Sequence, residues 1–486
     1  MVLGDARAKL EPMSAPTRLL VVDGSRRSTL LTVLAAVLLS ALAGLMTVKL
    51  GSLQHQLKAL LIVLAPIAMV VAALRPEVGL VIVMALAPIE FHFYGTGSDE
   101  LLLVAMSLVL VWRIQARAIP AWVAVGGLSL VLGSFVAAIG AASKTTALWG
   151  GARWLSAIIV LFAALSILRE RSDASRRMAD IFTGSAVVVV VFAFAQKAGI
   201  NAIVGAPYTA GHPSSFFAYY TNYAGYVAMA AIVATGEVLA ALLERRSARA
   251  ATYGAALVFI LTGVAISASR GGLLALGAGW LMLLVLNIRR GSILAQAIVV
   301  LAVFVAAGYL ATPHSTLVTL QQRLATPLGS QSEDKQRFAL QKAGEHALTQ
   351  YPAGLGFGNF ADYLRRNVRS AKIPEAFAHA QNTPVQIGLD AGWFGLAGFL
   401  MLFVWPVGLV LVRRSAGPST VRASAFAAAL AGFMAQGLYD YLFFEIAFLI
   451  FVVAMVWGTI HALSVEEPVA SRRLGRIFAP AAALER

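Results

Sequence analysis

The run GLAGFLMLFVWPVGLVLV, residues 395–412, has no charged residue along its whole length. A helix needs about 20 mostly apolar residues to cross the hydrocarbon core of a bilayer. The run ends at Arg413 and Arg414, and the polar stretch AHAQNTPVQIGLDAGWF, residues 378–394, precedes it. Arginines at one end of an apolar run are typical of the cytoplasmic side. This stretch therefore predicts a transmembrane helix whose N-terminus faces outward.

The rest of the chain has the same character. Of its 486 residues 59% are hydrophobic and 13% are charged, and its mean hydropathy is +0.80. Soluble domains carry about 25% charged residues, so this composition is that of a polytopic membrane protein. Apolar stretches of suitable length number about 14. They are centred near residues 38, 66, 86, 106, 130, 158, 189, 229, 258, 280, 302, 402, 429 and 452. We expect an all-α fold, a polytopic membrane helical bundle.

The basic residues predict the orientation of these spans. Loops after even-numbered spans are rich in arginine, whereas loops after odd-numbered spans are not. Because positive charge collects on the cytoplasmic side, both termini are expected in the cytoplasm. The net charge of +15 then reflects these loops rather than a nucleic-acid partner. The predicted divisions are a cytoplasmic tail at 1–28, about 11 membrane helices in 29–311, a large outer loop with short helices at 312–382, about three helices in 383–463, and a cytoplasmic tail at 464–486.

Ionisable residues near the span ends are the first functional candidates, because charge within a membrane is costly. Arg270 lies in SASRGG, residues 267–272, where two apolar runs meet with almost no loop. Its guanidinium therefore needs an anion, carbonyl groups or a carboxylate as a partner. Arg153 and His212 also fall at predicted outer ends. Arg153 could instead reach lipid headgroups, and His212 could be an ordinary loop residue.

The polar residues before the helix predicted from 384 suggest a second candidate region. TPVQ, residues 383–386, has the form of a capping box with Thr383 as N-cap and Gln386 three residues later. A helix N-terminus attracts anions such as phosphate. We therefore expect a phosphate to dock here, opposite Arg270.

The same region supplies a possible base. Asn382, Gln386 and Asp390 recur every four residues and are expected on one helix face, although Asp390 could be a structural contact. His379, just upstream, could accept a proton from a hydroxyl group. An arginine, a helix terminus and a histidine together favour transfer chemistry with a phosphate leaving group. Since the chain has no cysteine and no pattern of metal ligands, we expect neither a metal nor a cofactor.

Four blocks of sequence resemble the O-antigen ligase/polymerase superfamily of bacterial envelope glycosyltransferases. They are GHPSSFFAYYTNYAGYVAMA at 211–230, SASRGGLLAL at 267–276, YPAGLGFGNFADYL at 351–364 and NTPVQIGLDAGWFGLAGFL at 382–400. Asn222 and Arg270 match family positions in the first two blocks, and Asn382, Gln386 and Asp390 fall at the family spacing in the last. The blocks occur in the family's order, and each lies on the predicted outer side.

The resemblance implies a GT-C-like protein of the bacterial inner membrane with its active site in the periplasm. Such proteins are metal-independent, inverting transferases that take a glycan from an undecaprenyl-diphosphate donor to an acceptor sugar hydroxyl, in polysaccharide polymerisation or in ligation to lipid A–core. Arginines bind the diphosphate and a loop histidine activates the acceptor. The candidate catalytic residues are His379 and Arg270, and the candidate substrate-binding residues are Arg153, His212, Asn222, Asn382, Gln386 and Asp390.

Two departures from the family pattern matter. The family has a histidine directly before the asparagine that corresponds to Asn382. This sequence has Gln381 at that position, and its nearest histidine is His379. A second family arginine is replaced at His212. The missing histidine favours a polymerase over a ligase. A protein O-oligosaccharyltransferase and a transporter or flippase of lipid-linked glycan are the alternatives. Expected partners are the lipid-linked donor, an acceptor glycan or glycolipid, membrane lipids and other polysaccharide-assembly proteins.

Overall fold

The computed structural model of the chain describes residues 67–465 except 90–91, 94–95, 202–203, 205, 207–208, 210, 326–331, 369–378, 414 and 444. The predicted N-terminal tail and the first predicted span lie outside the described residues. So do part of the second predicted span and most of the predicted C-terminal tail.

The described chain is helical almost throughout. Its first half contains a helix over 67–74, α3 (Pro76–Leu86), β1 (His92–Phe93), β2 (Thr96–Gly97), α4 (Ser98–Leu110), the 3₁₀ helices η1 (Val111–Arg113) and η2 (Ala116–Ala118), α5 (Ala121–Gly140), α6 (Lys144–Ile167), α7 (Ala174–Lys197), α8 (Tyr220–Leu243) and α9 (Ser247–Ser267). Its second half contains α10 (Arg270–Leu286), α11 (Gly291–Ala311), α12 (His314–Ala325), α13 (Ser332–Gln350), α14 (Phe360–Asn367), α15 (Thr383–Val412), α16 (Pro418–Gly437) and α17 (Ile446–Val465). The two strands form one short antiparallel pair.

The helix lengths fit a membrane bundle. Eight of the described helices are long and apolar enough to cross a membrane, namely α5, α6, α7, α8, α9, α11, α15 and α17. The apolar helices α3, α4 and α10 are shorter, and α16 carries more small and polar residues. Each predicted span centre from residue 86 onward falls within a helix. The all-α polytopic membrane fold is therefore confirmed, whereas the total of about 14 spans stays a prediction.

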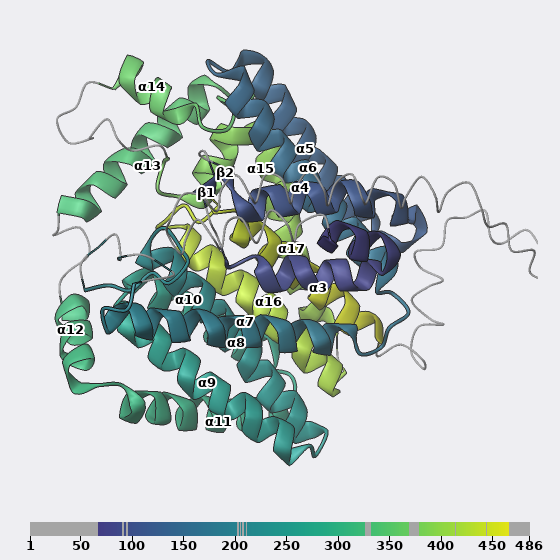
Figure 1. Ribbon diagram of the computed structural model, residues 1–486, viewed down its shortest axis with the longest axis vertical. Helices are drawn as coiled ribbons and strands as arrows, with labels where there is room; N and C mark the ends of the chain where they lie inside the picture. Colours follow the sequence, from purple (N-terminus) through teal and green to yellow (C-terminus); the bar gives the residue numbers. More distant parts are fainter. Residues whose placement is uncertain are drawn as a thin grey trace, which may run out of the picture.

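The core of the bundle lies around α8. Of the eight long helices it is the most enclosed, and it packs against α7, α9, α10 and α16 (Figure 1). Small residues let these helices approach closely. A Cβ added to Gly236 of α8 would lie 2.1 Å from Cβ of Ala425 in α16. A Cβ on Gly133 of α5 would lie 2.3 Å from the carbonyl oxygen of Ala391 in α15. Packing through small residues is the usual solution where lipid gives no hydrophobic drive for helix association.

Helix α15 is broken at Gly392, which has a φ of 68°. Its neighbour Trp393 donates a backbone hydrogen bond to the carbonyl of Pro352 at 3.0 Å, and the amide of Leu355 donates to the carbonyl of Leu389 at 2.6 Å. A Cβ on Gly392 would lie 2.7 Å from the backbone of Ala353. Only glycine allows both the positive φ and this approach. The break thus fastens the segment between α13 and α14 to the membrane domain.

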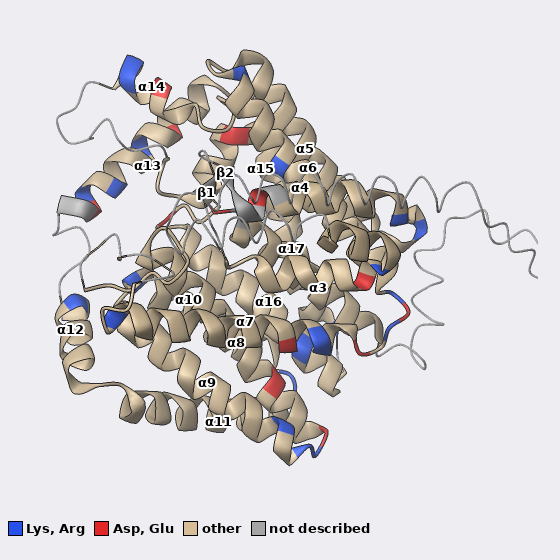
Figure 2. Ribbon diagram, viewed as in Figure 1, with Lys and Arg blue, Asp and Glu red and all other residues tan. Residues whose placement is uncertain are grey.

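Helices α12, α13 and α14 form the segment predicted as a large outer loop, and Figure 1 shows them together at one end of the bundle. Lysines and arginines gather on this segment and at the opposite end of the bundle, while the middle of the molecule has few (Figure 2). The predicted short helices in this loop are present. Residues 326–331 and 369–378 of the loop lie outside the described residues.

Candidate functional site

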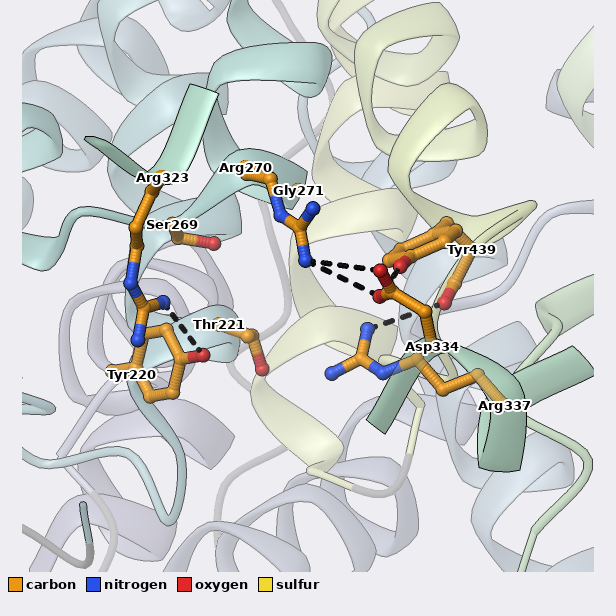
Figure 3. A pocket seen from close by; sticks show the side chains of 9 residues that line it. All are labelled: Tyr220, Thr221, Ser269, Arg270, Gly271, Arg323, Asp334, Arg337 and Tyr439. Carbon is orange, nitrogen blue, oxygen red and sulfur yellow. Dashed lines mark hydrogen bonds and ion pairs between the residues drawn. The ribbon is translucent and has the colours of Figure 1, made fainter. Parts of the chain in front are cut away.

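We refer to residues 312–382, which contain α12, α13 and α14 and were predicted as the outer loop, as the outer segment. A polar pocket lies where this segment meets the ends of α8, α10 and α16 (Figure 3). Its walls come from residues far apart in the sequence. They are Tyr220, Thr221, Ser269, Arg270, Gly271, Arg323, Asp334, Arg337 and Tyr439. Figure 3 shows Arg270 between Arg323 on one side and Asp334, Arg337 and Tyr439 on the other. We refer to this set as the arginine pocket.

The N-terminus of α10 forms one wall of the arginine pocket. Ser269 is the N-cap, and its side chain accepts a hydrogen bond from the amide of Gly272. The first backbone amides of the helix therefore lie at the pocket, beside Arg270. Gly272 is required for packing, because a Cβ there would lie 2.5 Å from Cβ of Ala224 in α8. The helix terminus and the guanidinium together make this wall suited to an anion.

Arg270 is paired with a carboxylate, as its sequence position required. Its Nη2 donates to both oxygens of Asp334, at 3.2 and 3.3 Å. The hydroxyl of Tyr439 also donates to Asp334. Burial raises the pKa of Tyr439 to about 12, and the bond to Asp334 adds to this rise, so the hydroxyl keeps its proton at neutral pH. The Asp334 side chain is 2% exposed and that of Arg270 is 20% exposed.

Two further arginines complete the pocket. Arg323 of α12 donates to the hydroxyl of Tyr220 at 3.2 Å. Arg337 of α13 lies over the ring of Tyr439 and is 4.0 Å from the carboxylate of Asp440. Among the described residues that line the pocket, three guanidinium groups share it with one carboxylate, that of Asp334, which gives this lining a net positive charge.

His212 adjoins the arginine pocket. Its Nδ1 is 3.1 Å from the carbonyl oxygen of Ser267, and its Nε2 is 3.0 Å from Nη2 of Arg323. A carbonyl only accepts and a guanidinium only donates, so Nδ1 carries the proton and Nε2 has the lone pair. The ring also lies on that of Tyr220. The loop that carries His212 is fastened to α7, since the amides of Ser214 and Ser215 donate to Gln196.

Arg153 does not line the arginine pocket. Its side chain is 4% exposed and forms a salt bridge with Glu100 at 3.3 Å. It also donates to the carbonyl of Phe443 at 3.2 Å and lies over the ring of Phe357. The structure therefore gives Arg153 protein partners in place of lipid headgroups.

Gln386 and Asp390 lie in the same buried region as Arg153. Gln386 donates to Asp390 at 2.8 Å and accepts from the amide of Ala380. The hydroxyl of Tyr441 donates to Asp390 at 3.3 Å, and His379 packs on the ring of Tyr441. We refer to Glu100, Arg153, Gln386, Asp390 and Tyr441 as the buried cluster.

The predicted capping of α15 was wrong in one respect. The N-cap is Asn382, whose side chain accepts from the amide of Val385, and not Thr383. Asn382 also donates to the carbonyl of Leu438, and Thr383 donates to that of Asp440. These two hydrogen bonds hold the N-terminus of α15 against the chain that follows α16. Among the described residues, the N-termini of α8 and α10 line the arginine pocket and that of α15 does not.

Asn222 lies next to the pocket residue Thr221 but is itself 3% exposed. Its amide donates to Glu445 at 2.8 Å, and the backbone amide of Ala218 donates to the same oxygen. This arrangement holds the start of α8 against the start of α17. Asn222 thus supports the wall of the pocket from behind.

Most residues of the arginine pocket could not be predicted from the sequence. Arg323, Asp334 and Arg337 lie in the outer segment, where charged residues are common and periodicity does not show which ones face the bundle. A weak signal was available for Arg323, which is the basic residue in the last turn of α12. Tyr439 had none, because its role depends on the turn between α16 and α17.

Comparison with known families agrees with the sequence resemblance. Residues 255–400 match the family model described as O-antigen ligase. The matched range includes Arg270, Arg323, Asp334 and Arg337, and it ends within α15. No curated protein matches the chain. Residues 255–400 are thus similar to the O-antigen ligase family, and the long apolar helices are those of a multi-pass membrane protein.

Proposed function

Starting from this similarity to the O-antigen ligase family, we propose that the protein transfers a glycan from an undecaprenyl-diphosphate donor to a sugar hydroxyl of an acceptor. The reaction takes place on the periplasmic face, with both chain termini in the cytoplasm. The observation that carries the proposal is the arginine pocket, in which three guanidinium groups and the N-terminus of α10 surround one displaceable carboxylate. A diphosphate is the part of such a donor that this charge distribution suits.

The diphosphate is the leaving group. In the proposed step the acceptor oxygen bonds to the anomeric carbon while the bond from that carbon to the diphosphate oxygen breaks. The electron pair leaves with the diphosphate, the acceptor proton moves to a base, and the configuration inverts. Arg270 takes one phosphate in place of Asp334, and Arg323 and Arg337 lie on either side of it. Fixed positive groups of this kind stabilise the developing charge, so the step needs no metal.

Two histidines are candidates for the base. His212 has its tautomer fixed, with the lone pair of Nε2 directed at Arg323 of the pocket wall. In the proposed step the Arg323 side chain binds the diphosphate and leaves His212. The lone pair of His212 Nε2 is then available to take the proton of the acceptor hydroxyl. His379 packs on Tyr441 of the buried cluster instead. The direct link to the pocket favours His212 as the base, while His379, predicted from the sequence, is the alternative.

Replacement of Arg270 tests the proposal. In proteoliposomes that contain the lipid-linked donor, Arg270→Ala should lower transfer by on the order of 10²–10³-fold and weaken donor binding, because a charged partner of the leaving group is lost. Arg365→Ala is the matched control, since Arg365 lies on α14 of the same outer segment, outside the lining of the arginine pocket, and pairs with the nearby Asp362. Normal transfer by correctly inserted Arg270→Ala protein would refute the proposal.

The base is identified by two parallel variants. His212→Gln keeps a group that can accept from Arg323 but cannot take up a proton, so transfer should fall by about 10²–10⁴-fold with donor binding unchanged. His379→Gln should then remain active. The reverse result would assign the base to His379. Assays with lipid-linked repeat units and with lipid A–core as acceptors separate polymerase from ligase activity, and the sequence favours the polymerase.

A further inference from the structure

A second polar hollow lies away from the arginine pocket, where α6 ends. Its volume is about 650 Å³. It is formed by the ends of η1, η2 and α6 together with the start of α3. The residues that line it are Pro76, Arg113, Gln115, Arg117, Ser166, Ile167, Arg169 and Glu170. The arginine pocket and this hollow share no residue.

The three arginines of the hollow differ from five other arginines of the inner loops. Those others are ion-paired: Arg171 with Glu77, Arg176 and Arg246 with Glu244, Arg177 with Asp173, and Arg249 with Asp180 and Glu237. In the hollow, Arg113 donates to the carbonyl of Ala73 at 2.9 Å, and Arg117 donates to the Gln115 side chain at 3.4 Å. Within the described ranges, no carboxylate forms a salt bridge with Arg113, Arg117 or Arg169. The hollow thus keeps an excess of positive charge.

The hollow lies at the level where lipid headgroups are expected. It opens at Ile167, where the membrane-length helix α6 ends. The adjoining residue Trp112 is 88% exposed, and Leu108, one turn earlier on α4, is 63% exposed. In a membrane protein, exposed leucine faces lipid, and tryptophan concentrates at the boundary between lipid tails and headgroups. An anion that enters the hollow past Leu108 and Trp112 therefore comes from the bilayer.

We infer that this hollow binds the phosphate headgroup of an anionic phospholipid. Arg113, Arg117 and Arg169 contact the phosphate oxygens, and Ser166 and Gln115 offer polar hydrogen-bonding groups beside them. The acyl chains lie along the exposed apolar side of α4. Basic hollows between membrane helices on the cytoplasmic side are suited to such headgroups. This site is independent of the proposed transferase activity.

Lipid retention by the full-length protein tests the inference. The protein is reconstituted with phosphatidylglycerol, cardiolipin or phosphatidylcholine, and the lipids that remain bound after detergent extraction are counted by native mass spectrometry. The triple variant Arg113→Gln, Arg117→Gln, Arg169→Gln should retain the two anionic lipids on the order of 10- to 100-fold less well. Phosphatidylcholine retention should not change.

Controls separate this site from general charge attraction. Arg177→Gln, Arg245→Gln and Arg289→Gln together remove the same charge from other inner loops and should leave retention unchanged. A triple lysine variant at the hollow should keep most of the retention and shows that the fold tolerates changes there. Equal loss in the control triple variant would overturn the inference. So would full competition by millimolar inorganic phosphate, which would indicate a site for free phosphate.

Discussion

The arginine pocket and the buried cluster contain similar side chains but use them differently. In the pocket, three arginines surround one carboxylate, and Arg270 and Arg337 are each about one-fifth exposed. In the cluster, Arg153 has Glu100 as its partner and is 4% exposed. Among the described residues, arginines outnumber carboxylates in the lining of the pocket, whereas in the cluster Arg153 pairs with Glu100 and Asp390 accepts hydrogen bonds from Gln386 and Tyr441. An excess of accessible arginines favours a ligand site, whereas buried charged groups that have partners within the protein favour a structural role.

The two regions are joined by the turn between α16 and α17. Tyr439 of this turn belongs to the pocket, and Tyr441 belongs to the cluster. Asp440 lies between them, where it approaches Arg337 and accepts from Thr383 through its carbonyl. The cluster therefore helps to hold one wall of the pocket in position, although none of its residues is among those that line the pocket. Variants in the two regions should then fail in different ways.

The largest effect on stability is expected for Arg153→Ala. The change removes the salt bridge from Arg153 to Glu100, whose side chain is 13% exposed, and breaking an enclosed pair of this kind costs about 3–5 kcal/mol. Folded yield in detergent and thermal unfolding monitored by tryptophan fluorescence would measure this. Arg337→Ala is the contrasting variant, since it should fold normally and transfer poorly. If Arg153→Ala were stable and inactive, Arg153 would belong to the substrate site, and the distinction between the two regions would be lost.

A smaller effect is expected for Asp334→Asn. The Asp334 carboxylate occupies the position on Arg270 that the diphosphate needs, so the amide should compete less with the donor. Donor binding should tighten by on the order of tenfold, which corresponds to about 1.4 kcal/mol. Titration with an undecaprenyl-diphosphate analogue would detect this. Weaker binding would mean that Asp334 positions Arg270 instead of competing for it.

The smallest effect is expected for Tyr441→Phe. This change removes the hydrogen bond to Asp390, which is 3.3 Å long, and preserves the ring against His379. A loss of about 1 kcal/mol in stability is expected, with donor binding unchanged. Thermal unfolding and the binding titration together check both parts. A large loss of transfer at normal stability would place Tyr441, and with it His379, in the catalytic machinery.

The sequence predicted the helices and the break at SASRGG because both follow from hydropathy and residue type. It also predicted that Arg270 needs an anionic partner, which is Asp334. It did not indicate which helix terminus lines the pocket, since α10 and α15 both begin with capping residues and only packing decides between them. The buried pair of Glu237 and Arg422, 2.8 Å apart, was also missed, although a glutamate within the apolar run of α8 was a usable signal.

The break at Gly392 has a mechanical consequence. The backbone bonds from Leu389 and Trp393 to the chain at 352–356 hold the C-terminal side of α13 to a membrane helix. The other side of α13 is held by the contact between Asp334 and Arg270, which a bound diphosphate would replace. The attachment at Gly392 consists of backbone hydrogen bonds, whereas the one at Asp334 is an ion pair between side chains. If the donor binds as proposed, the start of α13 loses this ion pair to Arg270 while its C-terminal side stays fastened to α15.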